Sequence, residues 1–422
     1  MMSLQATEQT RLRQDRDLVL ATATSTLSDT CAAVEELKGQ LETAHSRPAD
    51  FVALHHGSAR DITKLWPHAV EAFGNGALHG ASSCLGVMTD KGVPNARGDA
   101  LGALAIWDPY GSYGSAMVTL GKDPRSAGVD ATRQALVRAD RPGEAPDLVW
   151  LTATPGQEEA ILEGIKDVIG RSALIVGGSA ADNTVAGDWS VFSSEGVADA
   201  AVVVSVLFTS TPLGCAFESG YAPTEARGIV TAAEGRRVLG IDGRPAAEVY
   251  AEWTGANIAR PISGARSILS EATLKPLGRR HAEISGGPLQ LLAHPAVMHA
   301  DGGIDLFAEM SVGEEICLME GSEASLVNRA ERVACNSREQ LGNTPAAGAL
   351  MVYCGGCMLA LPDRMNEVAT GVSESLGGMP FLGVFSFGEQ GEMLDGVSAH
   401  GNLMISCTTF GRNQSQGLWS SR

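Results

Sequence analysis

An apolar run that ends on two glycines, within residues 173–183, constrains the fold of this chain more than any other stretch. The run Ala173–Val176 is short and contains β-branched residues, which favours a buried strand over a helix. The glycines that follow let another backbone or a ligand approach closely. The segment therefore predicts a strand that delivers a polar loop. The candidate ligand-binding residues of this loop are Gly178, Ser179, Asp182 and Asn183.

Two further segments, residues 77–86 and 380–389, repeat this pattern of apolar residues, glycine and small polar residues. Their candidate binding residues are Ser82, Ser83, Gly388 and Glu389. Strand ends in α/β sheets commonly gather around one pocket. We therefore expect the loops at Ser82, Ser179 and Glu389 to line one cavity, with simple tight turns as the alternative.

Composition limits the class of protein. At 422 residues, the chain is long enough for two domains of about 100 to 200 residues each. Hydrophobic residues make up 44% of the chain and charged residues 19%, which is typical of a compact globular protein. A net charge of −18 without a cluster of Lys and Arg argues against nucleic acid or an anionic membrane as partner.

The cellular compartment follows from the first residues and from the cysteines. Met1–Arg16 is polar and charged, so no signal peptide is expected there, and no window approaches 18 uninterrupted apolar residues. Seven of the eight cysteines are scattered through apolar or glycine-rich settings, which favours buried thiols over a disulfide framework. We expect a soluble, cytoplasmic protein.

The order of predicted elements indicates an α/β fold of mixed sheets with packed helices. In the first half, the predicted strands are residues 17–24, 51–55, 77–80, 147–153 and 174–177, and the predicted helices are residues 29–41, 61–73, 127–139 and 156–169. Leu27, Val34 and Leu41 are spaced by seven, which leaves a homodimer through this helix as an alternative.

The second half begins with antiparallel pairs. Residues 189–192 and 200–208 predict one pair, and residues 228–233 and 237–241 another, before a helix that ends at Trp253. Alternation lapses at residues 255–270, which predicts a two-domain layered architecture with domains at 15–254 and 255–412 and a flexible tail at 413–422. In the second domain, the predicted strands are 283–285, 305–308, 315–319, 350–353, 381–387 and 402–410, with helices at 323–337 and 364–376.

Several of these segments resemble a known family. LIVGGSAADN and IVTAAEGRRVLGIDGRPAAEVYAEWTG are similar to the FIST N domain, and GALMVYCGGC with PFLGVFSFGEQGE is similar to the FIST C domain. The resemblance covers residues 17–411. It implies an intracellular sensory module for small ligands that signals through other components, and in a subset of the family it implies haem and nitric oxide sensing.

The chain departs from the family pattern at Cys354 and before the last strand. A second cysteine, Cys357, stands where the family has a basic residue, and the approach to the last strand reads His400-Gly401-Asn402. The two cysteines are compatible with pocket lining, a redox pair or half of a zinc site. Zinc requires four ligands and no second pair follows, so we expect reduced thiols without a metal.

Histidines leave a haem alternative open. His55, His79 and His400 lie at strand ends or beside the glycine loops, and an axial haem ligand requires only one histidine in an apolar cleft. The chain has no CxxCH motif, so haem would bind noncovalently. Apart from this alternative we expect no cofactor.

An enzyme is the third reading. Cys354 or Ser179 would be the nucleophile and His400 or His79 the base, with Glu389 or Asp182 orienting that base. The sequence has no G-x-S-x-G nucleophile elbow between a predicted strand and a predicted helix. Catalysis is therefore kept as an alternative.

Taken together, the residues and the resemblance favour a sensor that binds an amino-acid-like molecule between its halves and reports to a partner protein. Ser179, Asp182, Asn183 and Glu389 would hold the ligand, together with Cys354, His400 and Asn402, and the acidic residues would favour an ammonium group. For Glu389 we weigh an inward carboxylate that needs a partner against a solvated turn.

Overall fold

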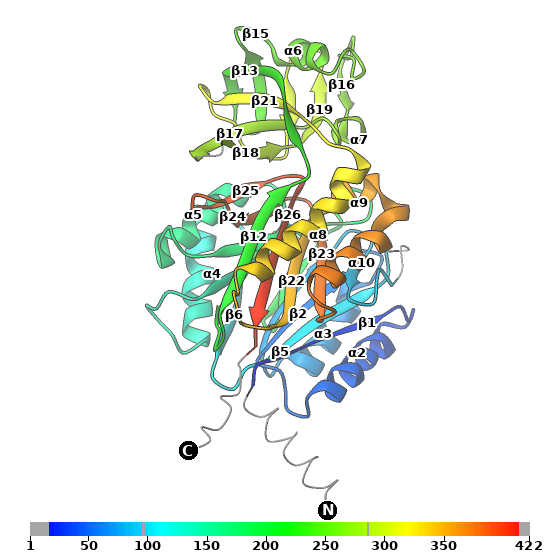
Figure 1. Ribbon diagram of the computed structural model, residues 1–422, viewed down its shortest axis with the longest axis vertical. Helices are drawn as coiled ribbons and strands as arrows, with labels where there is room; N and C mark the ends of the chain where they lie inside the picture. Colours follow the sequence, from blue (N-terminus) through cyan, green and yellow to red (C-terminus); the bar gives the residue numbers. More distant parts are fainter. Residues whose placement is uncertain (1–16, 95–97, 285–286, 413–422) are drawn as a thin grey trace, which may run out of the picture.

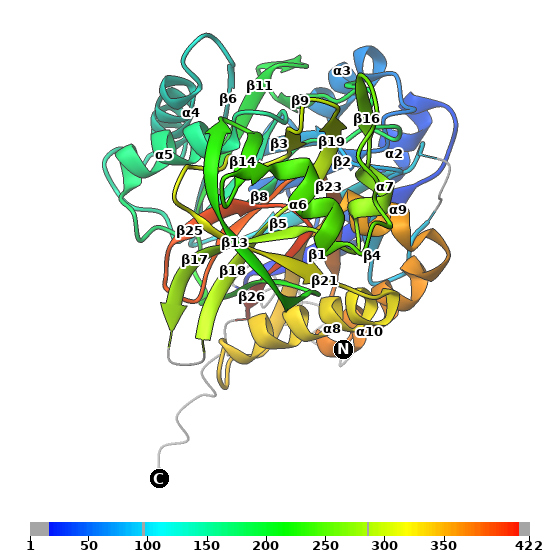
Figure 2. The same ribbon diagram turned by 90° about the horizontal axis from the view of Figure 1, so that it is seen from above.

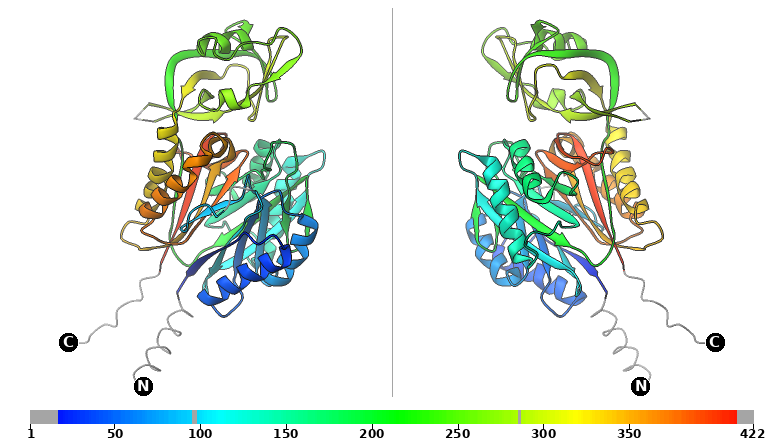
Figure 3. Two further views of the ribbon diagram at one scale, coloured as in Figure 1. Left: turned by 90° about the vertical axis from the view of Figure 1, so that its right-hand side faces the viewer. Right: turned by 90° about the vertical axis from the view of Figure 1, so that its left-hand side faces the viewer.

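The chain folds into two spatially separate units in the computed structural model, which describes residues 17–94, 98–284 and 287–412. The larger unit, here the body, contains residues 17–219 and 322–412. The smaller unit, here the cap unit, contains residues 222–320 and lies above the body (Figures 1 and 3). The chain passes between the units twice, after Ser219 and after Glu320.

The body contains three sheets. The first has the order β1 (Val19–Ser25), β5 (Leu101–Trp107), β2 (Phe51–His56), β3 (Ala77–Ser82), β9 (Val191–Ser193) and β10 (Gly196–Ala198). The second has the order β25 (Ser398–Gly401), β24 (Glu389–Glu392), β8 (Ile175–Gly178), β7 (Leu148–Ala153), β11 (Ala201–Phe208) and β6 (Ser112–Thr119). The third has the order β12 (Leu213–Ser219), β26 (Met404–Gly411), β22 (Ala346–Cys354), β23 (Phe381–Ser386) and β4 (Val87–Thr89).

A shared apolar core joins the three sheets. Phe51 of the first sheet, Trp150 of the second and Phe410 of the third are fully buried in the same cluster. Helices cover the sheets on their other faces: α2 (Thr30–Ala44) and α3 (Ile62–Phe73), α4 (Pro124–Arg138) and α5 (Glu158–Ile169), and α8 (Glu323–Glu339) and α10 (Met365–Ser375). Strands that are buried on both faces explain the continuous apolar runs in the sequence.

The cap unit is built on antiparallel strands around a core of its own. Its strands are β13 (Ala222–Glu234), β14 (Arg237–Ile241), β15 (Arg244–Pro245), β16 (Ala265–Ser267), β17 (Leu277–Ile284), β18 (Gly287–Ala293), β19 (Pro295–His299), β20 (Ile304–Leu306) and β21 (Glu315–Glu320). Two helices, α6 (Ala246–Trp253) and α7 (Leu269–Ala272), belong to the same unit. Seen from above, the cap unit covers the middle of the body (Figure 2).

The mixed α/β fold and most predicted elements are present. Asp29 and Asp61 cap α2 and α3 by accepting hydrogen bonds from Ala32 N and Thr63 N, as expected for aspartate at this position. The predicted hairpin at 228–241 is β13 and β14. Val34, Leu37 and Leu41 pack inside the body, so these side chains are not free to form a dimer interface. The tail at 413–422 lies outside the described residues.

One expectation about the arrangement differs from the structure. The pair predicted at 189–192 and 200–208 is wrong, because β9 pairs with β3 and β10 while β11 lies between β6 and β7. The two domains divided at residue 254 stay a prediction, and the cap unit contains residues on both sides of that position. Strands from both sequence halves also share sheets: β4 pairs with β23, β12 with β26 and β8 with β24.

Within residues 17–94, 98–284 and 287–412, the length and apolar character of every helix fall short of what a bilayer crossing requires.

Candidate functional site

A cavity of about 290 Å³ lies between the cap unit and the body. The cap unit contributes Ser267, Leu269, Ser270, Thr273, His294 and Phe307, and the body contributes Val185, Cys354, Gly356, Leu359, Ala360, Phe387, Gly388 and Asn402. Most of these side chains are apolar, and only a few polar groups converge on the cavity. Enclosed sites of this composition are typical of small-molecule binding.

Three chain segments at strand ends of the second and third sheets form much of the body side of the cavity. Cys354 ends β22 and precedes the short helix α9 (Gly355–Ala360). Gly388 lies between β23 and β24, and Asn402 lies between β25 and β26. Gly388 has a φ of +152°, and a Cβ there would lie 2.6 Å from His400 Cε1. A side chain at this position would therefore displace the histidine.

His294 and Asn402 form the buried polar part of the cavity wall. The backbone N–H of His294 donates to Asn402 Oδ1 at 3.1 Å, and His294 Nε2 lies 2.9 Å from the carbonyl oxygen of Leu269. Burial lowers the pKa of His294 to about 4, so the ring is neutral near pH 7. Among the described residues, Asn402 Nδ2 is buried without a hydrogen-bond acceptor.

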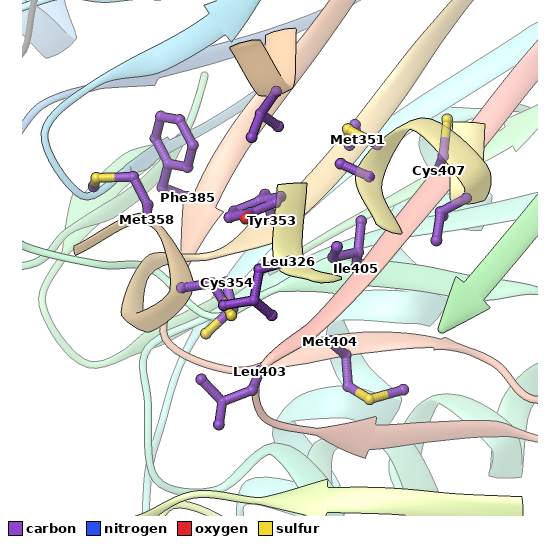
Figure 4. Close-up of a cluster of buried hydrophobic side chains, with 14 of the residues drawn as sticks. Leu326, Met351, Tyr353, Cys354, Met358, Phe385, Leu403, Met404, Ile405 and Cys407 are labelled. Carbon is purple, nitrogen blue, oxygen red and sulfur yellow. The ribbon is translucent and has the colours of Figure 1, made fainter. Parts of the chain in front are cut away.

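Cys354 is a buried thiol in the cavity wall. Burial, together with the neighbouring Cys357, raises the pKa of Cys354 well above its ordinary value. Figure 4 shows Cys354 near Leu403 and Met358 in an apolar cluster that also contains Met351 and Cys407. A protonated thiol in such surroundings is a poor nucleophile. The eight cysteines lie within the described residues and are free, as expected for reduced thiols; their freedom from metal stays a prediction.

Glu389 faces inward, as one of the two alternatives expected. Its side chain is fully buried, and its carboxylate accepts hydrogen bonds from Ser386 Oγ at 2.7 Å, Gly388 N at 3.2 Å and Met404 N at 3.0 Å. Burial raises the pKa of Glu389 well above its ordinary value, with a further contribution from Cys354. The carboxyl group is therefore engaged by protein groups and is not part of the cavity lining.

A charged cluster beside the cavity connects the cap unit to the body. Arg236 of the cap unit places Nη2 2.6 Å from Glu158 Oε2 and 2.6 Å from Glu159 Oε2 at the start of α5. We call these three residues the Arg236 clamp. Ser179 Oγ donates to Glu158 Oε1 at 2.6 Å, and the backbone N–H of Glu309 donates to Glu159 Oε1 at 2.9 Å. Ser179 thus helps to hold Glu158 of the Arg236 clamp in place.

His400 completes this cluster on the body side. Its Nδ1 lies 3.1 Å from Gln390 Nε2 and its Nε2 lies 3.4 Å from the carbonyl oxygen of Phe307. Glu158, Glu159 and His400 offer donor atoms within 4.8 Å of one another, which is a spacing that a metal ion could use. The Arg236 guanidinium already pairs with both carboxylates, so a metal ion at this position would compete with a resident cation.

The Arg236 clamp should make the folding stability of the protein sensitive to acid. Burial opposes ionisation of Glu159, but His400, Arg236 and the Glu309 N–H lower the pKa of Glu159 from 4.5 to about 2. Because the folded pKa is depressed, this stabilisation is present above about pH 4.5 and is lost as pH falls toward 2. Between pH 6 and pH 3 we expect the free energy of unfolding of the wild type to fall. The free energy of unfolding of Glu159→Gln should fall by on the order of 2 kcal/mol less over the same pH range.

Denaturant titrations across this pH range measure the difference. Glu71→Gln, an exposed glutamate on α3, is the control and should follow the wild type. If the free energy of unfolding fell equally with pH in Glu159→Gln and in the wild type, the stabilising role of the Glu159 carboxylate would be contradicted.

The remaining predicted residues hold loops in place. Asp182 accepts from the backbone N–H groups of residues 184 to 188, and Asn183 Oδ1 accepts from Leu85 N at 2.8 Å. Ser82 Oγ accepts from Ser190 N at 3.0 Å, and Ser83 Oγ accepts from Phe385 N at 2.8 Å. Gly178 leaves no room for a Cβ, which would lie 2.6 Å from Ser386 Cβ.

The three glycine loops therefore meet, but of their predicted residues only Gly388 lies in the cavity lining. Gly178 pairs with Glu389 across β8 and β24, and Ala181 N donates to the carbonyl oxygen of Ser82 at 3.1 Å. Of the predicted site residues, the structure places only Cys354, Gly388 and Asn402 in the lining. A carboxylate for an ammonium group is missing from that lining, so the expectation of an amino-acid-like ligand gains no support from the geometry.

The haem alternative has no suitable arrangement around its candidate histidines. His79 Nδ1 and Nε2 are bound to Ser205 Oγ at 2.8 Å and Thr152 Oγ1 at 2.9 Å. His55 is fully buried, and burial next to His56 lowers its pKa to about 3. The cavity lining contains neither of them, nor His400. The residues present therefore do not fit a haem held by any of the three.

The residues predicted for the enzyme alternative do not assemble into an activated nucleophile and base. Ser179 is bound to Glu158, His79 lies in the network of Ser205 and Thr152, and Asp182 is saturated by backbone N–H groups. Cys354 and Glu389 are neighbours, but burial raises the pKa of both. This pairing keeps the proton on the thiol and does not activate it.

Several cavity residues were missed by sequence reasoning. His294, Phe307 and Leu269 belong to the cap unit, where the predicted elements carried no polar loop after a strand. A histidine directly after an apolar strand, as in the run 289–294, is the one local signal that was present. Its meaning depends on Asn402, which lies 108 positions away in sequence.

Comparisons with known proteins agree with the sequence motifs. The family model for the FIST N domain matches residues 50–244 and the model for the FIST C domain matches residues 246–392. No curated protein matches the chain.

Solved structures give weak similarities. A cyanuric acid hydrolase from A. caulinodans aligns with 9% identity and a TM-score of 0.36, over 93% of this chain and 99% of that chain. PurLQS from Thermotoga maritima aligns with 10% identity and a TM-score of 0.22, over 97% of this chain and 77% of that chain. Similarities this weak establish neither a shared fold nor a shared activity.

The fold and the cavity define a two-unit α/β protein with a candidate small-molecule site between the units. By the two matching domain models, the chain belongs to the FIST family. FIST domains are associated with small-ligand sensing and signal transduction.

Proposed function

We propose that this protein is a cytoplasmic sensor that binds a small molecule in the cavity between the cap unit and the body and signals through a partner protein. The observation that carries the proposal is the shared lining, in which Phe307 and His294 of the cap unit face Phe387 and Asn402 of the body. A ligand in contact with both units binds more tightly to one relative placement of them than to another, which is how occupancy can bias a conformation.

Two further features support the proposal. The chain crosses between the units only after Ser219 and after Glu320 among the described residues, so few covalent connections restrict the placement of the cap unit. The free cysteines are consistent with a reducing compartment. A strongly acidic chain with net charge −18 also favours a protein partner over nucleic acid or an anionic membrane.

A rim substitution tests the cavity. Ser270 is exposed at the edge of the lining, so Ser270→Trp should fill the opening without disturbing the core. We expect the wild type, isolated from cells under native conditions, to carry a small molecule that intact native mass spectrometry detects, and we expect Ser270→Trp to lose at least about nine tenths of it, since a blocked opening removes at least tenfold in apparent affinity.

Ser263→Trp is the matched control, because Ser263 is exposed in the same segment but lies outside the lining. This variant should retain the molecule as the wild type does. A wild type without any bound molecule, or equal retention by Ser270→Trp, would overturn the cavity as the sensing site.

A further inference from the structure

The cavity lining includes a residue whose side chain carries a hydrogen-bond donor with no acceptor. Asn402 is only 3% exposed, its Oδ1 accepts from His294 N at 3.1 Å, and within the described chain its Nδ2 has no partner. The bond to His294 fixes which end of the amide is oxygen. Leaving such a donor unsatisfied is costly, so a ligand that supplies an acceptor gains from this position.

The cavity wall also offers an acceptor. Because His294 Nε2 faces the carbonyl oxygen of Leu269 at 2.9 Å, it carries the ring proton, and Nδ1 keeps its lone pair. No hydrogen bond to Nδ1 is found among the described residues. Since the His294 backbone N–H donates to Asn402 Oδ1, the unpaired donor and the acceptor belong to two residues in contact.

The rest of the cavity lining offers no partner of opposite charge to a charged ligand. It contains Leu269, Phe307, Leu359 and Phe387, and it contains no Asp, Glu, Lys or Arg. Transfer of an ionised group into such surroundings is costly when no partner of opposite charge is present. A ligand of this cavity must therefore satisfy one donor and one acceptor while it remains uncharged.

We propose that the cavity takes a small, uncharged, mainly apolar molecule with an amide-type group, whose carbonyl oxygen accepts from Asn402 Nδ2 and whose N–H donates to His294 Nδ1. This inference rests on the proposed function, since it names the ligand class for the same cavity. The apolar part of the molecule packs against Phe307 and Phe387.

Three probes with the same ring separate the contributions of the carbonyl group, the N–H group and the charge to binding by the wild type. Benzamide offers both a carbonyl and an N–H, acetophenone offers the carbonyl alone, and benzoate carries a charge. Ligand-observed NMR titrations should give benzamide about fivefold tighter binding than acetophenone, equivalent to one net hydrogen bond, and at least about tenfold tighter binding than benzoate. Benzoate binding as tightly as benzamide, or no benzamide binding up to its solubility limit, would overturn the inference.

Two variants assign the two hydrogen bonds separately. His294→Phe should abolish the advantage of benzamide over acetophenone, because it removes the acceptor and keeps an aromatic ring. Asn402→Leu should weaken benzamide and acetophenone together by about fivefold. Unchanged affinities in both variants would contradict the assignment, and the probe series in the wild type decides the ligand class even if one variant fails to fold.

The outcomes also separate this inference from the proposed function. Acetophenone binding that Ser270→Trp abolishes, combined with no preference for benzamide, would leave the sensor cavity standing and would overturn the amide class. Binding of all three probes that is insensitive to Ser270→Trp would overturn both.

Discussion

Replacement of Glu389 by leucine is expected to lower the free energy of unfolding by about 3 to 5 kcal/mol. The carboxylate is fully buried and accepts hydrogen bonds from Ser386 Oγ, Gly388 N and Met404 N. Leucine would leave these three buried donors without an acceptor, each at a cost of about 1 to 3 kcal/mol that other contacts partly offset. Chemical denaturation monitored by circular dichroism measures the change.

Two variants control for the change in size and charge. Glu389→Gln keeps an acceptor oxygen and should cost less than half as much as Glu389→Leu, because the side chain can still accept from part of the donor set. Glu392→Leu, on the same strand but half-buried, should change stability by about 1 kcal/mol or less. If Glu389→Leu unfolded at the wild-type denaturant concentration, the structural role of this carboxylate would be wrong.

Replacement of Arg236 in the clamp should lower the free energy of unfolding by nearly as much as replacement of Glu389. Arg236→Ala leaves Glu158, whose side chain is 1% exposed, and Glu159 without their shared cation. Loss of one partner of a buried ion pair typically costs about 3 to 5 kcal/mol, because the remaining charge stays desolvated. We expect a loss near 3 kcal/mol, since Arg236 itself is 20% exposed, measured again by denaturant unfolding at neutral pH.

The neighbouring arginine is the matched control. Arg237 pairs with Asp301 within the cap unit, and both side chains are substantially exposed, so Arg237→Ala should cost about 0 to 1 kcal/mol. The double variant Arg236→Ala with Glu159→Gln should lose less than the sum of the two single losses, because both changes remove one interaction. Equal effects of Arg236→Ala and Arg237→Ala would show that the clamp contributes nothing to stability.

The clamp and the cavity share chain segments, which links these predictions to function. Phe307 lines the cavity and its carbonyl oxygen faces His400 Nε2, while Gly388 lines the cavity and approaches the same histidine. A ligand that moves Phe307 therefore also changes the surroundings of Glu159. Coupling of this kind requires a contiguous set of contacts, and Phe307, His400 and Glu159 form such a set between the two units.

Local patterns in the sequence predicted most elements of the fold. The strand at 51–55, the helices at 29–41 and 61–73, and the hairpin at 228–241 were predicted because strand, helix and turn signals act over a few residues. The sequence also pointed to Cys354, Gly388 and Asn402, which the structure places in the cavity lining. For Glu389 the sequence left an inward and a solvated placement open, and the structure shows the inward one.

The tertiary structure alone decided which segments share a sheet and what each polar side chain contacts. Pairing of β4 with β23 and of β8 with β24 joins residues about 200 or more positions apart, and backbone hydrogen bonds carry no sequence label that would reveal such partners. Asp182 and Ser179 had the residue types of a ligand site, yet neighbouring backbone groups and Glu158 use their hydrogen-bonding capacity. His294 became a site residue only because folding of the cap unit placed it against Asn402.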